Sequence, residues 1–213
     1  SAASDVYKRQ GKQQVYDWKR YKETVRKLSP TTVIFSDVGP DIRWVGNEKG
    51  IAGTTNWNLL NIEGFTPGLG APSTDTLNSG NKNGTHWIPA ECDVSIRPGW
   101  FYHAEEDNKV KSPEQLFDLY LKSVGRGATL LLNVPPDRRG KFHANDSAAL
   151  VGLKELRTES FKKDILKNAK HTSLKQNHFL KEVIITLRES EKINCIVLKE
   201  DLKKGQQIAK YHI

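Results

Sequence analysis

The side chains best suited to acid–base chemistry and ligand binding lie in one stretch of the sequence, from Asp41 to Trp100. Glu48 is prominent within it, because it follows an apolar run and has Trp44 and Val45 close before it. A carboxyl group acts as a general acid near neutral pH where burial or a nearby negative charge raises its pKa. Most glutamates on loops are simply solvated, so position alone leaves both interpretations of Glu48 open.

The elements that would hold these side chains follow the pattern of an α/β protein. Asp17 can cap a helix whose apolar residues recur at helical spacing as far as Leu28. The run 31–36 (TTVIFS) is short, apolar and β-branched, which is typical of a buried strand in a parallel sheet. From Asp37 to about Gly99 the chain is rich in Gly, Asn, Thr and Pro. A loop region of that length is rare in a compact domain unless it has a function.

A second helix, a second strand and a third helix follow. Residues 112–115 (SPEQ) have the pattern of a capping box with proline in the first turn, and we expect Gly125 to end this helix. The run 129–134 (TLLLNV) predicts another buried strand. Asp146 is the expected cap of the third helix, which continues through Leu156. Helices alternating with buried strands are typical of an α/β barrel or a doubly wound sheet.

The sequence changes character after Arg157 and becomes rich in lysine. Apolar stretches at 183–187, 193–198 and 206–213 predict antiparallel strands separated by polar turns. This part of the chain therefore reads as the start of a second, all-β domain.

Composition argues against several other classes of protein. The net charge is +8, but the basic residues are not gathered on one segment with aromatics, so we expect no nucleic-acid binding. No apolar run reaches the length of a membrane span. Cys92 and Cys195 have neither CxxC spacing nor histidines nearby. We expect two buried thiols rather than a disulfide or a metal site, and no cofactor.

Three strings carry a resemblance to a known family: IFSDVGPDIRWVGNEKG at 34–50, WIPAECDVSIRPGWFYH at 87–103 and LLLNVPPDRRG at 130–140. They resemble the α-L-fucosidases of glycoside hydrolase family 29, in particular the subgroup that prefers branched α-1,3 and α-1,4 fucosides. The resemblance implies the C-terminal half of a TIM-like (β/α)8 barrel at 11–157, and a truncated galactose-binding-like β-sandwich at 158–213. It implies a fucosylated oligosaccharide or glycoconjugate as substrate, and favours a secreted or periplasmic location.

The resemblance also assigns chemical roles. A retaining glycosidase uses one carboxylate as nucleophile and a second carboxyl group to protonate the leaving oxygen and then activate water. Glu48 matches the acid/base in the GNE motif of the subgroup. The family's nucleophile is an aspartate in a Trp-Phe-Asp-Gly-like motif, which this sequence lacks. We therefore expect an inactive fragment of an exo-α-L-fucosidase; the alternative is a carbohydrate-binding protein without turnover.

Four further residues are candidate sugar ligands, each with a structural alternative. Asp41 and Arg43 either bind sugar hydroxyls and orient Glu48, or form an ion pair that stiffens the loop. Glu91, expected at the end of a strand, either binds sugar or sets the pKa of a neighbour. Trp100 either offers an apolar face to the methyl group of fucose or packs in the core.

The loop 58–86 lies between Glu48 and the next expected strand. Protonation occurs at the oxygen of the leaving group, so residues near the acid/base also lie near the leaving sugar. We therefore expect this loop to contact the sugar that carries fucose.

Residues 1–10, SAASDVYKRQ, are a separate case. All ten match the translation of adapter and transposon-end DNA used to prepare sequencing libraries. We expect them to be a non-native tail and leave them out of the reasoning about the fold.

Overall fold

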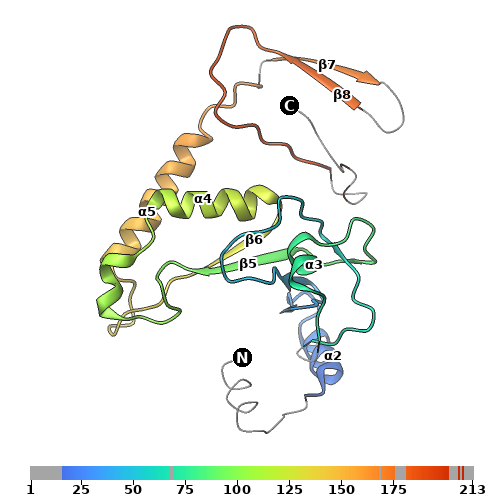
Figure 1. Cartoon of the computed structure of the whole chain (residues 1–213), viewed down its shortest axis with the longest axis vertical. Coiled ribbons are helices and arrows are strands. Elements are labelled where there is room, and N and C mark those ends of the chain that lie inside the picture. The colour runs from blue at the N-terminus through green and yellow to red at the C-terminus, as the bar shows by residue number, and fades with distance from the viewer. Residues whose placement is uncertain are drawn as a thin grey trace.

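The computed structural model of the chain describes residues 16–67, 70–167, 169–175, 181–201, 206 and 208. Its centre is a four-stranded parallel sheet with the strand order β1-β2-β5-β6 (Figure 1). The strands are β1 (Phe35–Ser36), β2 (Ile42–Trp44), β5 (Ala90–Ser95) and β6 (Thr129–Asn133). The sequence-based expectation of an α/β fold with a parallel sheet is confirmed.

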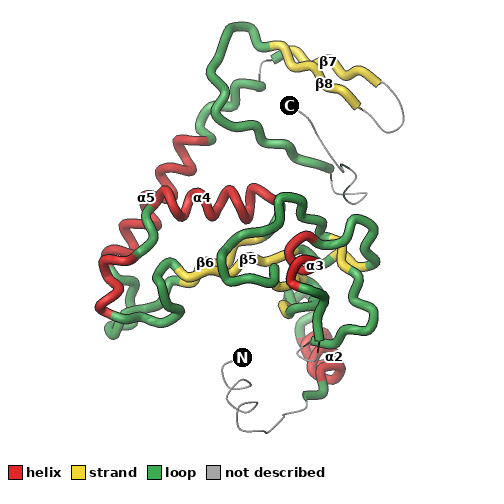
Figure 2. Tube along the Cα trace, viewed as in Figure 1, coloured by secondary structure: helices red, strands yellow, loops and turns green. Residues whose placement is uncertain are grey.

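The two faces of this sheet are very different. Cys92 and Val94 of β5 point toward the helices and belong to the buried apolar clusters, together with Leu130 of β6. Glu91 and Asp93 alternate with them and therefore lie on the other face. Figure 2 shows α4 (Pro113–Ser123) and α5 (Ala144–Ser160) on the same side of β5 and β6. The second face is thus polar along β5 and is less covered by the described residues.

The helix between β5 and β6, α4 (Pro113–Ser123), begins as the sequence predicts. The Ser112 hydroxyl accepts from the Gln115 backbone N–H at 3.3 Å, and the Gln115 side chain accepts from the Ser112 N–H at 2.9 Å. The end of the helix was predicted wrongly. A short 3-10 turn, η2 (Val124–Arg126), continues past Gly125, and Gly127 with φ +79° ends it. The left-handed residue is therefore Gly127, which carries no Cβ penalty there.

The helix after β6, α5 (Ala144–Ser160), packs against α4 and confirms the third predicted helix. Its cap is His143 rather than Asp146, since the His143 side chain accepts from the Asn145 N–H at 3.3 Å. Asp146 instead lies in the first helical turn, fully buried against Arg97. The carboxylate is placed there because a buried cation needs a partner.

The first described helix, α2 (Trp18–Leu28), is capped by Asp17 as predicted, with the Arg20 N–H donating at 2.9 Å. The strand expected at 31–36 is shorter and much less buried than its sequence indicates. Only Phe35–Ser36 pair with β2, and Val33 and Phe35 are 60% and 46% exposed. A parallel strand is normally covered on both faces, and the described residues do not provide that cover here.

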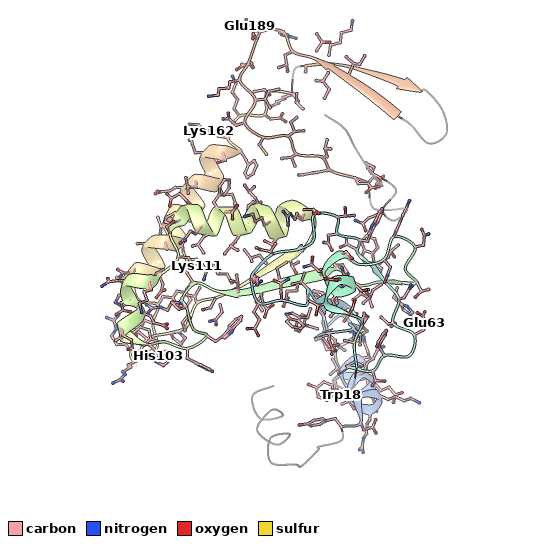
Figure 3. All side chains as sticks on the ribbon, viewed as in Figure 1. Trp18, Glu63, His103, Lys111, Lys162 and Glu189 are labelled. Atoms are coloured by element: carbon pink, nitrogen blue, oxygen red, sulfur yellow. The ribbon has the colours of Figure 1, made fainter. Side chains whose placement is uncertain are left out.

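The segment between β2 and β5 has more structure than its composition suggested. It holds β3 (Leu59–Leu60) paired antiparallel with β4 (His86–Trp87), and the short helix α3 (Thr74–Ser79). Leu60, Leu77 and Ile88 form a small buried core under it. In Figure 3, Glu63 of this segment lies on the right of the view, and His103, which follows β5, lies on the left. A Cβ added at Gly46, in the turn after β2, would lie 3.1 Å from Thr74 Cγ2, so the start of α3 lies beside this turn.

The C-terminal part contains one antiparallel pair, β7 (Lys170–Lys175) with β8 (Lys181–Thr186), beyond the end of α5 (Figure 1). β8 confirms the strand expected at 183–187, whereas β7 was not predicted, and 193–198 forms no strand. Most of 206–213, and all of 1–10, lie outside the described residues. Cys92 is buried as expected, but Cys195 is exposed, which contradicts the prediction.

Candidate active site

Three residues from separate loops or strands lie at the carboxyl edge of the sheet. Glu48 follows β2, Trp100 follows β5, and Asn133 is the last residue of β6. Neighbouring parallel strands end at the same edge, which is where α/β proteins place their functional groups. The Trp100 indole Nε1 donates to Glu48 Oε2 at 3.1 Å, so the structure brings two of the predicted site residues into direct contact.

Glu48 sits in a tight turn bounded by two glycines. Gly46 and Gly50 have φ values of +85° and +72°, in the left-handed region that favours glycine. Within the turn, Asn47 Oδ1 accepts from the Lys49 N–H at 3.0 Å. The Gly50 N–H donates to the Asp93 carbonyl at 3.2 Å and ties the turn to β5. The backbone therefore fixes where the Glu48 side chain starts, although that side chain is exposed.

Gly50→Ala should destabilise the chain by roughly 2–4 kcal/mol, because the new methyl group adds overpacking to an unfavourable φ. Its Cβ would lie 2.7 Å from Val94 Cγ1. Gly140→Ala is a matched control, since Gly140 also has φ +72° but has nothing within 4 Å of the added Cβ. Urea unfolding of both variants measures the difference. Equal losses at the two positions would contradict the packing argument.

The loop after β5 is anchored through its backbone. Ser95 Oγ donates to the Gly99 carbonyl at 2.6 Å, and Asn133 Nδ2 donates to the Trp100 carbonyl at 2.9 Å. Arg97 Nη1 donates to the His103 carbonyl at 3.3 Å. Asn133 thus holds a loop in place by backbone contact. Trp100 itself is 36% exposed, so its indole lies at the surface and is not packed in the core.

Glu91 is not at the end of its strand, as the sequence suggested, but is the second residue of β5. Its register partner on β2 is Trp44, whose Nε1 donates to Asp93 Oδ1 at 2.8 Å. Burial, and then the negative charge of Asp93, raise the pKa of Glu91. Glu91 therefore lies with Asp93 and Trp44 on the face of the sheet opposite the helices, and the turn that carries Glu48 lies further toward the carboxyl edge.

Arg43 is fully buried on the helix-facing side of β2. Its guanidinium donates to the carbonyls of Leu77 and Trp57, both at 2.9 Å, and also to the Ile88 carbonyl. Within the described residues no carboxylate forms an ion pair with it, and burial lowers its pKa to about 10. Arg43 therefore stays protonated at neutral pH and ties the α3 segment to the sheet. This placement favours its structural alternative over sugar binding.

Asp41 forms an ion pair with Arg26 of α2 instead of Arg43. It also accepts from the Ile34 N–H at 2.6 Å. The Arg26 guanidinium holds the pKa of Asp41 below its usual value. The stiffening ion pair that the sequence allowed is thus present, but it has a different partner, and Glu48 takes no part in it.

Sequence reasoning missed a buried ionic cluster next to the Trp100 loop. Arg97 is 1% exposed, and its Nη2 lies 2.7 Å from Asp146 Oδ2 while its Nη1 lies 2.9 Å from Asp107 Oδ1. The Tyr102 ring stacks under the guanidinium at 4.8 Å from its centroid. The signal that could have found it is a single arginine directly after an apolar strand, because such a residue must be paired if it is buried.

The described residues contain no group of three or more His, Cys, Asp or Glu side chains placed to hold a metal ion. No helix in this part of the chain is long and apolar enough to cross a membrane.

The fold and the site define a class: an α/β enzyme unit with a carboxyl group and an aromatic side chain at the carboxyl edge of a parallel sheet. The family described as Alpha-L-fucosidase matches residues 5–155. The chain is 34% identical to Alpha-L-fucosidase 1 of Arabidopsis thaliana, over 89% of this chain and 42% of that protein. The chain belongs to the α-L-fucosidase family, glycoside hydrolase family 29.

Solved structures agree with this assignment. A glycoside hydrolase 29 family member from an unknown rumen bacterium is 39% identical, with a TM-score of 0.69 over 76% of this chain and 29% of that chain. A Ruminococcus gnavus GH29 fucosidase, solved in complex with fucose, is 28% identical, with a TM-score of 0.63 over 76% and 34%. The chain spans less than half the length of the curated relatives it matches.

Proposed function

We propose that the chain supplies the acid/base half of a retaining exo-α-L-fucosidase that removes terminal α-1,3- or α-1,4-linked L-fucose from glycans. Glu48 is the acid/base. The observation that carries the proposal is the position of Glu48 on a glycine-bounded turn at the carboxyl edge, within the part of the chain that matches the family. Its hydrogen bond from Trp100 supports the same role, because the contact joins two edge loops where substrate would lie.

In the proposed reaction, the Glu48 carboxyl group gives its proton to the glycosidic oxygen as the bond to fucose breaks. The fucosyl group passes to an aspartate nucleophile, which we assign to the preceding half of the catalytic domain because no motif in this sequence matches it. Glu48 then takes a proton from the water that releases fucose. Trp100 remains the proposed sugar neighbour. Arg43, Asp41 and Glu91 are proposed to stabilise the sheet and loops around the site and not to bind sugar.

The architecture supports a half-barrel as part of this proposal. Phe35 and Leu131 lie on the inner face of the sheet and are 46% and 52% exposed, as they would be if further strands normally closed over them. The proposed domains are a partial barrel at 11–157 and a partial galactose-binding-like sandwich at 158–213, the latter supported by the β7–β8 pair. The adapter origin of 1–10 stays a prediction; the family match starts at residue 5, inside that segment.

The 213-residue chain alone should release no nitrophenol from an aryl α-L-fucoside, because loss of one carboxylate of such a pair removes most of the rate. The measurement compares the chain with buffer and with its Glu48→Gln variant. Release above background that Glu48→Gln abolishes would show that the nucleophile is in this chain after all. A carbohydrate-binding protein would release no nitrophenol even when joined to the proposed nucleophile-bearing half of the domain. That result would separate it from the proposed enzyme.

A further inference from the structure

The two oxygens of the Glu48 carboxyl group have different surroundings. Oε2 accepts the indole N–H of Trp100 at 3.1 Å. Oε1 has no hydrogen-bond partner among the residues that the structure describes. An indole nitrogen can donate but cannot accept, so it favours the carboxyl oxygen that carries no proton.

The position of the Trp100 indole is itself fixed. Its backbone carbonyl is held by Asn133 Nδ2 at 2.9 Å, and Ser95 Oγ holds the preceding carbonyl, that of Gly99, at 2.6 Å. On the face of the sheet opposite the helices, Trp44 of β2 makes the same kind of contact with Asp93 of β5, at 2.8 Å. One bond joins the two strands and the other joins the loops that follow them, with donor and acceptor reversed. The Trp100 bond therefore links the two edge loops directly.

We infer that Trp100 is a positioning residue, which holds Oε2 of Glu48 so that the proton for the leaving group resides on Oε1. The inference rests on the proposed function and deepens it, since the sequence suggested only an apolar contact for Trp100. An exposed glutamate otherwise samples several rotamers with either oxygen protonated. Holding one oxygen selects the orientation in which the other faces the glycosidic bond, and the N–H then stabilises the carboxylate left after proton transfer.

The test uses Trp100→Phe in the full-length enzyme, because phenylalanine keeps an aromatic ring and has no N–H donor. We expect kcat/KM for a branched fucosyl trisaccharide to fall about tenfold with little change in KM, since an alkoxide leaving group needs the proton. An activated aryl fucoside, which departs without a proton, should change by less than about twofold. Trp87→Phe is the control: Trp87 is exposed on β4 and makes no contact with Glu48, so both substrates should react as with the wild type.

Equal losses on both substrates, or no loss on either, would overturn the inference. Thermal unfolding shows whether Trp100→Phe is folded. Where it is not, Asn133→Ala frees the Trp100 backbone and keeps the indole, and it must give the same selective loss; an even loss would again overturn the inference. A wild-type enzyme with no activity on either fucoside would instead refute the proposed function, so the two failures are distinguishable.

Discussion

Glu48→Ala in the full-length enzyme is expected to lower kcat/KM for a branched fucosyl oligosaccharide by about 10²–10⁴-fold, the usual contribution of a general acid. For an aryl fucoside with a good leaving group, kcat/KM should change far less, because the aryl oxide departs without a proton. Release of the fucosyl-enzyme also needs a base, so kcat on the aryl substrate should still fall. Azide, which needs no base, should restore it and give fucosyl azide of retained configuration.

The control for this experiment is Glu155→Ala. Glu155 is an exposed glutamate on α5, in the helix layer that covers the sheet, so its loss should leave both substrates unaffected. Equal losses of kcat/KM on the two substrates in Glu48→Ala, with no effect of azide, would assign Glu48 a structural role.

The largest stability effect is expected at the buried ion pair of Arg97 and Asp146. Asp146→Ala should lower the free energy of unfolding by about 3–5 kcal/mol, because it leaves a buried guanidinium without its main counter-charge. Both side chains are 0% exposed, and the bidentate contact has distances of 3.0 and 2.7 Å. Urea unfolding at neutral pH measures the loss.

Asp118→Ala is the matched control, since Asp118 also pairs with a basic residue, Lys122 at 2.6 Å, but on the exposed face of α4. That variant should cost no more than about 0.5 kcal/mol, as is usual for an exposed pair of this spacing. A replacement of both Arg97 and Asp146 by apolar residues should be less harmful than Asp146→Ala alone, because it leaves no buried guanidinium without its main counter-charge. Similar losses at Asp118 and Asp146 would contradict this account.

Local features of the fold could be predicted from the sequence, and distant pairings could not. The capping box at 112–115 was predicted correctly, because all its partners lie within one helical turn. Asp146 was assigned as a cap because it stands at the start of an apolar pattern, whereas its real partner is 49 residues away. The apolar run 31–36 predicted burial that depends on neighbouring strands, which a local pattern cannot supply.

The candidate site was predicted in part. Glu48 and Trp100 were both selected, yet their mutual hydrogen bond joins residues 52 positions apart and had no sequence signal. Arg43 lies five positions before Glu48 and was expected to flank it. Its side chain points to the helix-facing side of the sheet instead, because side chains along a strand alternate and only the register decides which face each one takes.

The thiol of Cys92, in the middle of β5, can report the opening of the sheet that carries the site. Burial, and then the charge of Asp93, raise the pKa of Cys92 to about 12, so the folded chain presents almost no thiolate there at neutral pH. Cys195 is exposed and open to alkylation. Once Cys195 is blocked with iodoacetamide, any further labelling must come from molecules in which β5 has opened. The rate of Cys92 alkylation therefore reports how often β5 opens. This is the strand that carries Glu91 and Asp93 and that holds the Glu48 turn in place.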